Sequence, residues 1–588
     1  MKRNFLSCLL FFFVITAMKD SAQERIITGI VVAKDDGLPI PGVSVKLKGT
    51  NRGVVTNPQG KYSISLPSTG QEVLVFSYIG FQAREINANS KTIDVTLESS
   101  ANALDEVVIA AGGIKRTARE QGYATTRIDA ETLTAGKSPT IAGGLTGKVP
   151  GLQVNATGTG VNPSYRLVLR GDRSITGNNQ ALIVLDGAVV PNELLGNINP
   201  DDVDDIQILN GASGAALYGS DASNGVLIIT TKRGKKGAPI IKFSNTTAVE
   251  KISFYPQLQN RFGSGTDDFP VVYEPIENQQ YGPAFDGTLR PIGRPTESGN
   301  IQMAVYSPRN DKYDFWNTGV ANQTDFSLSL GDDKSSTYIS AQYLDGDGTT
   351  PKDNYTRAAF RFNGDRSFSK NFSAKYNVSF TQNKYNTTNS TSSMYQFLLN
   401  TPAQIPLLTY TDWQNPDSWA NPNNYYNDYY ENPYWVIDGY SQATKNDYLT
   451  GLLEFNYKPL EWLNLTYRAS LSNRYYENKN SNRGFVYSAY ALSTSAKTNE
   501  GSSVNDNLFQ NSNFSTDFIA NMKKDIKDFS INFLAAASLR SFTSKDLYAS
   551  GGGLQVPELY NLSNITGTPG ASACNSNTRQ YGVWGDLT

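Results

Sequence analysis

The chain has 588 residues, a formal net charge of -2 and no histidine. A chain of this length forms several domains. The lack of histidine excludes histidine-based catalytic triads and histidine-ligated zinc sites, and the near-neutral charge argues against nucleic-acid binding, which needs a basic face. We therefore predict no enzymatic activity, no catalytic residue, no metal site and no cofactor.

Residues 1–22 have the pattern of a secretory signal peptide. Lys2 and Arg3 precede an apolar stretch, and Ser21-Ala22 offers a cleavage site. Cys8 lies inside that stretch, so Cys574 is the only cysteine of the mature chain and can form no internal disulfide. No later segment reaches the roughly 18 apolar residues of a membrane-spanning helix, so membrane insertion would have to use strands.

Residues 26–98 contain short apolar or alternating runs separated by turn signals. The clearest turn is Asn57-Pro58-Gln59-Gly60, with Pro at the second position and Gly at the fourth. This spacing predicts about seven strands in an immunoglobulin- or transthyretin-like β-sandwich.

A short apolar run then lies within a polar connection, residues 104–113. It reads Leu104, Asp105, Glu106, Val107, Val108, Ile109, Ala110. Such a run has free backbone donors and acceptors, so it can add as a strand to the sheet of another protein. The alternative is that it forms the first strand of the next domain.

Residues 120–234 alternate β-branched runs with segments rich in Gly, Ala and Ser. This pattern predicts a compact α+β domain whose small-residue faces lie against something larger. The stretch from Gly143 to Val149 looks like a phosphate-binding loop, but its glycine spacing is one residue short and Val149 replaces the Ser or Thr that would hold magnesium. The stretch from Ala156 to Asn162 is interpreted as a loop, since it lacks the strand-to-helix context of a dinucleotide site.

Within residues 238–588, segment after segment alternates apolar and polar side chains, as in Phe326-Ser327-Leu328-Ser329-Leu330. Repeated along many strands, this predicts an antiparallel transmembrane β-barrel with a wet lumen. Short turns alternate with long connections, which we assign to the periplasmic and external sides. We count about nine or ten strands, fewer than the roughly 22 of a barrel wide enough for an internal domain, and expect further strands to complete the barrel.

One long connection, from Thr409 to Tyr440, is rich in aromatic side chains interleaved with Asn and Asp. Aromatic faces beside amide and carboxylate groups suit the stacking of sugar rings and the binding of their hydroxyls. The candidate substrate-binding residues are Trp413, Trp419, Tyr425, Tyr426, Tyr429, Tyr430 and Trp435. Two alternatives stay open, a membrane-interface girdle and a packed loop core.

Several pieces of the chain, in their order, resemble the plug domain of TonB-dependent outer-membrane receptors, specifically the SusC/RagA class. The resemblance rests on the runs GKVPGLQV from Gly147, LRG from Leu169, VLDG from Val184, INPDD from Ile198, AALYG from Ala215 and NGVLIITTK from Asn224. The predicted sandwich is similar to a carboxypeptidase-regulatory-like domain, through GVSV from Gly42, TNPQGKY from Thr56 and YIGF from Tyr78. That domain type has no peptidase chemistry.

The resemblance implies an importer in the outer membrane. Residues 104–110 would be the TonB box, TonB would supply the energy, and a SusD-like surface lipoprotein would close over the mouth. The cargo would be an oligosaccharide or a peptide, and the barrel would be embedded in outer-membrane lipid. A siderophore receptor is one alternative. A surface adhesin that uses a barrel only as an anchor is another, and a plug and a TonB box argue against it.

Overall fold

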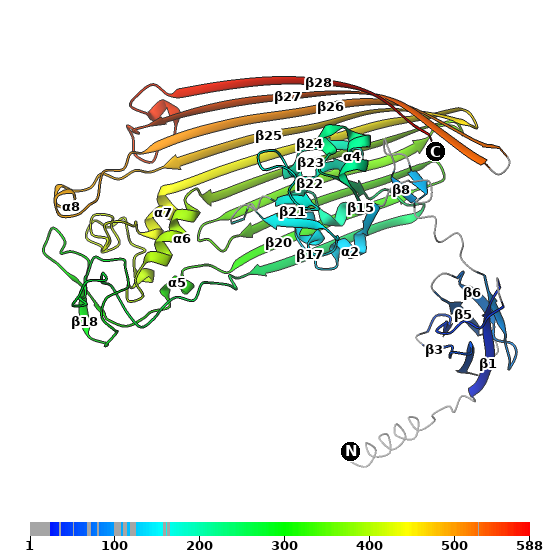
Figure 1. Ribbon diagram of the computed structural model, residues 1–588, viewed down its shortest axis with the longest axis horizontal. Coiled ribbons are helices and arrows are strands. Elements are labelled where there is room, and N and C mark those ends of the chain that lie inside the picture. Colours follow the sequence, from blue (N-terminus) through cyan, green and yellow to red (C-terminus); the bar gives the residue numbers. More distant parts are fainter. Residues whose placement is uncertain are drawn as a thin grey trace, which may run out of the picture. The chain divides into compact units, whose positions relative to one another are not determined.

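The computed structural model describes residues 24–34, 37–50, 52–67, 72–78, 81–98, 107–109, 115–117, 125–156, 160–161, 165–526 and 529–587 (Figure 1). The predicted signal peptide, residues 1–22, lies outside these ranges. The chain divides into two compact units, one containing the strands up to residue 108 and the other the chain from residue 122. No helix among the described residues is long and apolar enough to span a bilayer.

The first unit is a β-sandwich of seven strands, as predicted. One sheet has the order β4-β1-β7 and the other β3-β2-β5-β6. The strands are β1 (Glu24–Ala33), β2 (Ser44–Leu47), β3 (Gly53–Val55), β4 (Lys61–Pro67), β5 (Val73–Ser77), β6 (Arg84–Asn87) and β7 (Val95–Leu97). Alternate side chains point inward, as with Tyr62, Ile64 and Leu66 of β4, and these form the apolar core between the sheets.

The predicted turn at Asn57 is confirmed and explains how β4 begins. The Asn57 side chain accepts hydrogen bonds from the backbone N–H of Gln59 (3.0 Å) and Lys61 (2.9 Å). Gly60 has φ +70°, which a residue with a side chain rarely adopts, and its N–H donates to the Asn57 carbonyl at 2.9 Å.

The second unit contains an α+β domain that we refer to as the plug, residues 125–234. Its mixed five-stranded sheet has the order β10-β15-β16-β13-β14, and a hairpin, β11-β12, lies beside it. The strands are β10 (Thr125–Asp129), β11 (Leu152–Ala156), β12 (Tyr165–Leu169), β13 (Leu182–Leu185), β14 (Ala188–Val190), β15 (Val203–Leu209) and β16 (Val226–Thr231). The central strands β15 and β16 are buried along most of their length, because other elements cover both faces of the sheet.

Short helices connect the plug strands. They are α2 (Ala130–Thr134), α3 (Ile141–Leu145), α4 (Gly211–Tyr218) and the 3-10 turns η4 (Asn192–Gly196), η5 (Pro200–Asp202) and η6 (Ser220–Ala222). The small residues noted in the sequence allow these helices to approach closely. A Cβ atom at Gly144 of α3 would lie 2.9 Å from the Leu133 carbonyl oxygen of α2.

The rest of the second unit is one antiparallel sheet of ten strands in chain order, which we refer to as the wall. Its strands are β17 (Gly237–Glu250), β20 (Gly319–Gly331), β21 (Ser335–Asp347), β22 (Asn354–Ser367), β23 (Phe372–Thr388), β24 (Tyr440–Leu460), β25 (Leu463–Asn482), β26 (Ser503–Ile526), β27 (Phe529–Gly552) and β28 (Gly570–Leu587). The predicted alternation holds. In β22, Phe360 points to the outer face, whereas Arg361 and Asn363 are buried on the plug-facing side.

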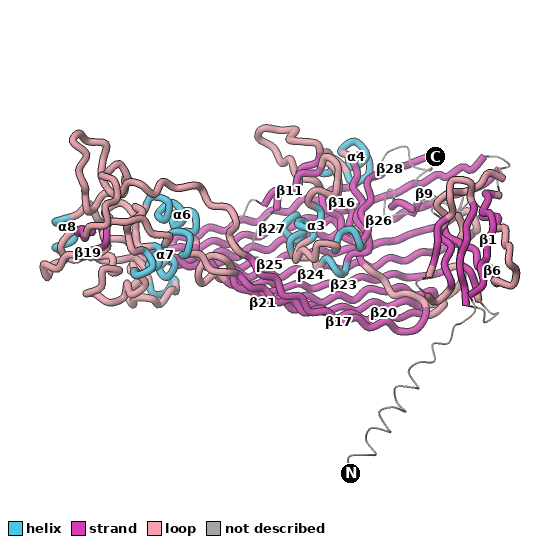
Figure 2. The backbone as a smooth tube through the Cα atoms, turned by 90° about the horizontal axis from the view of Figure 1, so that it is seen from below, coloured by secondary structure: helices cyan, strands magenta, loops and turns pink. Residues whose placement is uncertain are grey.

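The long connections gather at one edge of the wall, as Figure 2 shows. Three of them, residues 251–318, 389–439 and 483–502, share an apolar core, and we refer to them together as the loop cluster. It contains β18 (Leu289–Ile292), β19 (Gln302–Val305), α5 (Asp311–Asp314), α6 (Thr391–Asn400), η7 (Leu407–Thr409), α7 (Pro433–Gly439) and α8 (Ala489–Thr494). A fourth connection, 553–569, carries η8 (Leu562–Asn564). The connection from β21 to β22, residues 348–353, is short although it lies at this edge.

Removing a buried ring from the sandwich core is expected to destabilise the first unit. Phe76 is fully buried and its ring lies 5.4 Å from that of Tyr62. We expect Phe76→Ala to destabilise this unit by roughly 3–5 kcal/mol, because the removed ring leaves an unfilled volume. Hydrogen exchange of the β1, β4 and β5 amides measures the effect. The matched control is Val55→Ala at a side chain that is 68% exposed, and equal loss of protection in both variants would contradict the assignment.

Candidate functional site

The plug lies against one face of the wall (Figures 1 and 2). This is the face on which the wall buries polar side chains such as Arg361 and Asn363. A buried cation of the wall makes the central contact. Arg361 of β22 donates from Nε to Asp202 Oδ2 at 3.3 Å, and its Nη1 lies 3.5 Å from Asp186 Oδ2. All three side chains are at most 7% exposed. A buried arginine between two carboxylates is strongly held, because water cannot replace either partner.

Neighbouring groups complete this contact. Asp186 accepts hydrogen bonds from the backbone N–H (2.9 Å) and hydroxyl (2.6 Å) of Thr231. Tyr338 of β21 donates to Asp202 at 3.0 Å, and Asn363 donates to the Thr231 hydroxyl at 2.7 Å. Asp186 and Asp202 belong to two of the runs singled out in the sequence, VLDG and INPDD. The sequence did not indicate that both meet one arginine of the wall.

A second arginine of β22, Arg357, joins the wall to other parts of the plug. Its guanidinium donates to the carbonyls of Gly196 (3.2 Å) and Pro139 (3.1 Å) and to the side chain of Gln342 (2.9 Å). Nearby, Asn199 of the plug donates to Asp325 of β20 at 2.8 Å. Because Arg357 donates to plug carbonyls and the Asn199 amide of the plug donates to the wall, these bonds fix the plug against strands β20 to β22.

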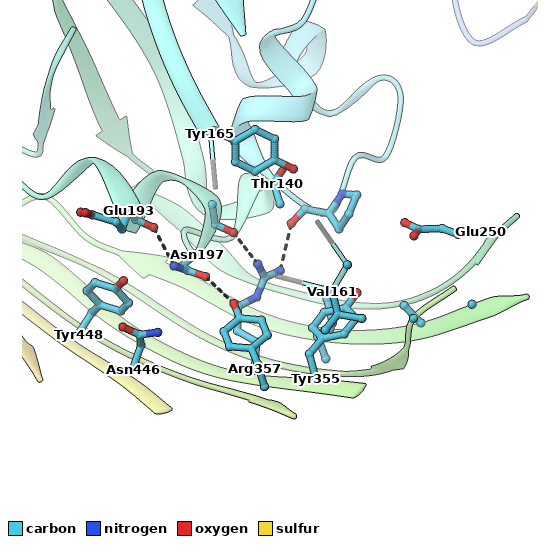
Figure 3. Close-up of a pocket in the computed structure, with 18 of the residues that line it drawn as sticks. Thr140, Val161, Tyr165, Glu193, Asn197, Glu250, Tyr355, Arg357, Asn446 and Tyr448 are labelled. Atoms are coloured by element: carbon cyan, nitrogen blue, oxygen red, sulfur yellow. Dashed lines mark hydrogen bonds between the residues drawn. The ribbon is translucent and has the colours of Figure 1, made fainter. Parts of the chain in front are cut away.

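A cavity of about 590 Å³ lies between the plug and the wall (Figure 3). Glu250, Gly319 and Asp347 line it, and each lies at the strand end nearest the long connections. A volume of this size falls within the roughly 300–1,000 Å³ typical of ligand sites. The cavity is therefore placed to receive a molecule that enters from the loop side.

Tyrosine rings and amides dominate the cavity lining. The five tyrosines are Tyr165, Tyr355, Tyr385, Tyr448 and Tyr476. Three arginines, Arg166, Arg357 and Arg474, are balanced by three acids, Glu193, Glu250 and Asp347. Arg474 is held in place by Asn446 Oδ1, 3.1 Å from Nη2, and lies over the ring of Tyr476 at 5.2 Å. This lining has no net charge and combines stacking surfaces with hydrogen-bonding groups.

Sequence reasoning missed these tyrosines because they come from strands and turns far apart in the chain. The alternation of side chains along the strands did indicate which tyrosines point inward. Tyr385 follows Thr381 and Asn383 at spacing two, so it belongs to the polar, inward face of β23 rather than to the outer one.

The predicted substrate-binding aromatics do not line this cavity and lie instead in the loop cluster. Trp413 (6% exposed), Tyr425 (5%), Tyr426 (2%) and Trp435 (1%) lie in the apolar core of the loop cluster. Trp419 is partly buried against that core. Only Tyr429 is largely exposed, at 65%, and Tyr430 is half-buried. The packed loop core, one of the alternatives above, thus describes four of the seven. Contact between any of the seven and a cargo stays a prediction.

The segment predicted as a TonB box is described only in part. Val107, Val108 and Ile109 form β8 (Val107–Ile109), which pairs with β9 (Lys115–Thr117) in a separate two-stranded sheet. The five-stranded plug sheet begins with β10, so β8 is not one of its strands. Leu104, Asp105, Glu106 and Ala110 lie outside the described residues.

The glycine-rich run before Val149 does not present its lysine to a phosphate. Lys148 Nζ bonds the backbone carbonyl of Thr132 and lies 3.4 Å from that of Leu133. Within the described part of the chain, no group of three or more Cys, Asp or Glu side chains could hold a metal ion.

Comparison with known proteins gives two domain matches. Residues 27–109 match the CarboxypepD_reg-like domain. Residues 117–226 match the TonB-dependent Receptor Plug Domain.

Two curated relatives each match more than half of this chain. The chain is 34% identical over 354 residues to TonB-dependent receptor P39 of Formosa agariphila, covering 59% of this chain and 32% of that protein. It is 29% identical over 346 residues to TonB-dependent receptor SusC of Bacteroides thetaiotaomicron, covering 57% of this chain and 31% of SusC. The chain spans about a third of the length of these relatives.

Among solved structures, the RagAB peptide transporter has a similar fold. The TM-score is 0.61 at 16% identity, and the match covers 82% of this chain and 54% of the transporter chain. At this identity the likeness concerns the fold.

The buried arginine predicts a large effect on plug seating. We expect Arg361→Met to destabilise the plug on the wall by roughly 3–5 kcal/mol, because Asp186 and Asp202 would stay buried without their cation. Urea-dependent proteolysis of the plug measures the effect. The control is Lys137→Ala, which removes an exposed cation 3.9 Å from Asp201 and should change stability by less than about 1 kcal/mol. An Arg361→Met effect no larger than the control would contradict this role.

Asp353, in the short connection before β22, predicts that the stability of the fold depends on pH. Its Oδ1 accepts from the Thr388 N–H at 3.1 Å, while Oδ2 is buried with no partner among the described residues. Burial raises the pKa of Asp353 to about 6. The folded pKa exceeds the unfolded one, so the protonated carboxyl stabilises the fold at low pH and this contribution is lost as pH rises through about 6.

We therefore expect Asp353→Asn to be more stable than the wild type at pH 8, by at most roughly 3 kcal/mol, and equally stable near pH 4. Thermal unfolding across this pH range gives the comparison. Asp347→Asn, at an exposed carboxylate at the end of β21, serves as control. A difference between Asp353→Asn and the wild type that does not change with pH would rule out the titration of Asp353 as its cause.

Proposed function

We propose that this chain, which belongs to the SusC/RagA class of TonB-dependent receptors, acts in the TonB-dependent import of large nutrients across the outer membrane. The observation that carries the proposal is the cavity of about 590 Å³ between the plug and the polar face of the wall, at the loop side. A molecule bound there contacts the plug and the wall at once. Its binding can therefore change how the plug is held.

In the proposed mechanism, cargo contacts plug groups that line the cavity, such as Gln180, Asn192 and Glu193. TonB then adds to the segment from Leu104 to Ala110 by strand pairing and pulls. A pull that moves the plug has to separate Asp186 and Asp202 from Arg361. The energy comes from the partner, so the mechanism includes no nucleotide and no catalytic residue.

For the cargo, we propose an oligosaccharide. The cavity offers five tyrosine rings for stacking and amides such as Asn192, Asn197 and Asn446 for hydroxyl groups. The three arginines and three acids balance, which disfavours a strongly charged cargo such as a ferric siderophore with several carboxylates. A peptide is the second candidate cargo, because the same arginines and acids can bind its two charged ends.

We propose the outer surface of the loop cluster as the docking site for a SusD-like lipoprotein. Large apolar side chains are exposed there, including Phe254 (94%), Phe269 (98%) and Leu289 (62%). Exposed large apolar side chains favour a protein partner. The outer face of the wall, with Phe360, Leu453 and Phe518 exposed, would contact outer-membrane lipid.

Uptake measured in cells tests the proposal. The protein is produced from its native gene, and cells receive fluorescently labelled oligosaccharides or peptides. Val108→Pro should abolish uptake while cargo still binds, because proline removes a backbone donor from the segment that pairs with TonB. Tyr355→Ala should weaken cargo binding by about tenfold, since one aromatic ring that stacks on the cargo is lost.

The matched control is Tyr343→Ala on the outer face of the neighbouring strand β21, where the side chain is 55% exposed. It should leave binding unchanged. Equal uptake by the wild type and Val108→Pro would overturn the TonB-dependent mechanism. Uptake of peptides and not of oligosaccharides would overturn the cargo assignment alone.

A further inference from the structure

One arginine that lines the large cavity has hydrogen-bond donors that no group of the described chain accepts. Arg474 of β25 donates from Nε (3.2 Å) and Nη2 (3.1 Å) to a single oxygen, Asn446 Oδ1. Its Nη1 makes no hydrogen bond to a described residue, and Glu193 Oε1 of the plug lies 3.5 Å from it. The Arg474 side chain is 13% exposed and lines the cavity. A guanidinium that is largely removed from water and incompletely bonded favours a further acceptor.

The other two arginines of the lining are bound more closely. Arg357 donates to two plug carbonyls and to Gln342. Arg166 is paired with Asp172 at 2.6 Å. Arg474 is therefore the arginine of the lining whose carboxylate neighbour is too distant for a good hydrogen bond.

Aromatic rings hold the Arg474 guanidinium in place without removing its charge. Its Cζ atom lies 5.2 Å from the ring centroid of Tyr476, 5.7 Å from that of Tyr448 and 5.9 Å from that of Phe509. Rings at these distances attract a cation. The planar guanidinium keeps its charge and its fork of N–H donors, which match the two oxygens of a carboxylate.

Glu193 is a weakly held partner of this arginine. Its side chain is 54% exposed, so solvent screens the ion pair and the pair contributes little. Glu193 belongs to η4 of the plug and lies across from Asn446 and Tyr448 of the wall (Figure 3). Both members of the pair line the cavity, whereas the two ion pairs of Arg361 lie outside the lining. A carboxylate that enters the cavity can therefore replace Glu193 at Arg474.

We propose that Arg474 recognises a carboxylate of the cargo, and that this carboxylate displaces Glu193. The assignment rests on the proposed function and narrows its cargo to an oligosaccharide that carries a uronic acid. The tyrosines and amides of the lining bind the neutral part of the sugar, and a single carboxylate is compatible with a lining of balanced charge. Because Glu193 belongs to the plug and Arg474 to the wall, the same exchange removes one ion pair between them.

Binding of acidic sugars to the protein, produced from its native gene and purified in detergent, tests the assignment. The probes are disaccharides that end in glucuronic, galacturonic or mannuronic acid. Each is paired with its methyl ester, which keeps the ring and removes the charge. We expect at least one acid to bind about tenfold more tightly than its own ester, because only the acid brings a charged carboxylate to Arg474. Calorimetry measures the two affinities.

Two variants with matched controls separate recognition from exchange. Arg474→Gln should weaken binding of that acid by about tenfold and leave the ester unchanged, whereas Arg366→Gln, at an exposed arginine of β22, should change neither. Glu193→Gln should tighten binding of the acid severalfold, because the competing carboxylate is gone. Glu297→Gln, at an exposed carboxylate of the loop cluster, is its control. Since Glu193 is largely exposed, its variant tests the proposal even where Arg474→Gln fails to fold.

The proposal is overturned if no acid binds more tightly than its ester, or if the preference for the acid survives Arg474→Gln. Acid binding that Glu193→Gln leaves unchanged would overturn the exchange. A tripeptide that outcompetes every acid, and loses this advantage when its carboxyl end is amidated, would overturn the choice of a sugar.

Failure of this proposal is distinguishable from failure of the import function. Acids and esters that bind equally, and that Tyr355→Ala weakens equally, would leave the cavity as a cargo site without a carboxylate contact. Val108→Pro should bind the acid like the wild type, because this measurement does not involve TonB.

Discussion

The plug depends on one buried cation of the wall. Arg361 is surrounded by protein and holds Asp186 and Asp202 on two separate turns of the plug. Removing either partner would leave a buried charge uncompensated, and this costs several kcal/mol. The same strand carries Arg357 to the carbonyls of Pro139 and Gly196. The position of the plug, and with it the floor of the large cavity, follows from these two arginines of β22.

The alternation of side chains along the wall makes this arrangement possible. Each strand sends polar groups to one side and apolar groups to the other, so a single sheet serves a wet interior and an apolar exterior. Arg357, Arg361 and Asn363 are separated by even numbers of residues, four and two, and so lie on the same inner face of β22. Tyrosines at inward positions, such as Tyr385 and Tyr448, reach the cavity from the same face.

In the loop cluster, aromatic side chains stabilise the long connections by packing against one another. Trp413, Tyr425, Tyr426 and Trp435 pack in its core, because a long connection without such a core could not keep a defined shape. The ring of Tyr429, at the edge of that core, stays exposed to solvent. Glu431 and Glu500, about seventy residues apart in the chain, line one cavity of about 180 Å³ there.

By itself the sequence determined the elements with a local or periodic cause. It predicted the seven-stranded sandwich, the turn at Asn57, the α+β plug and about ten alternating strands, since turn chemistry and spacing two depend on neighbours in the chain. Only the tertiary structure decided which distant residues meet. The contact of Arg361 with Asp186 and Asp202, the tyrosines around the large cavity, and the burial of the loop aromatics all depend on how separate segments pack, and no local pattern in the sequence encodes that packing.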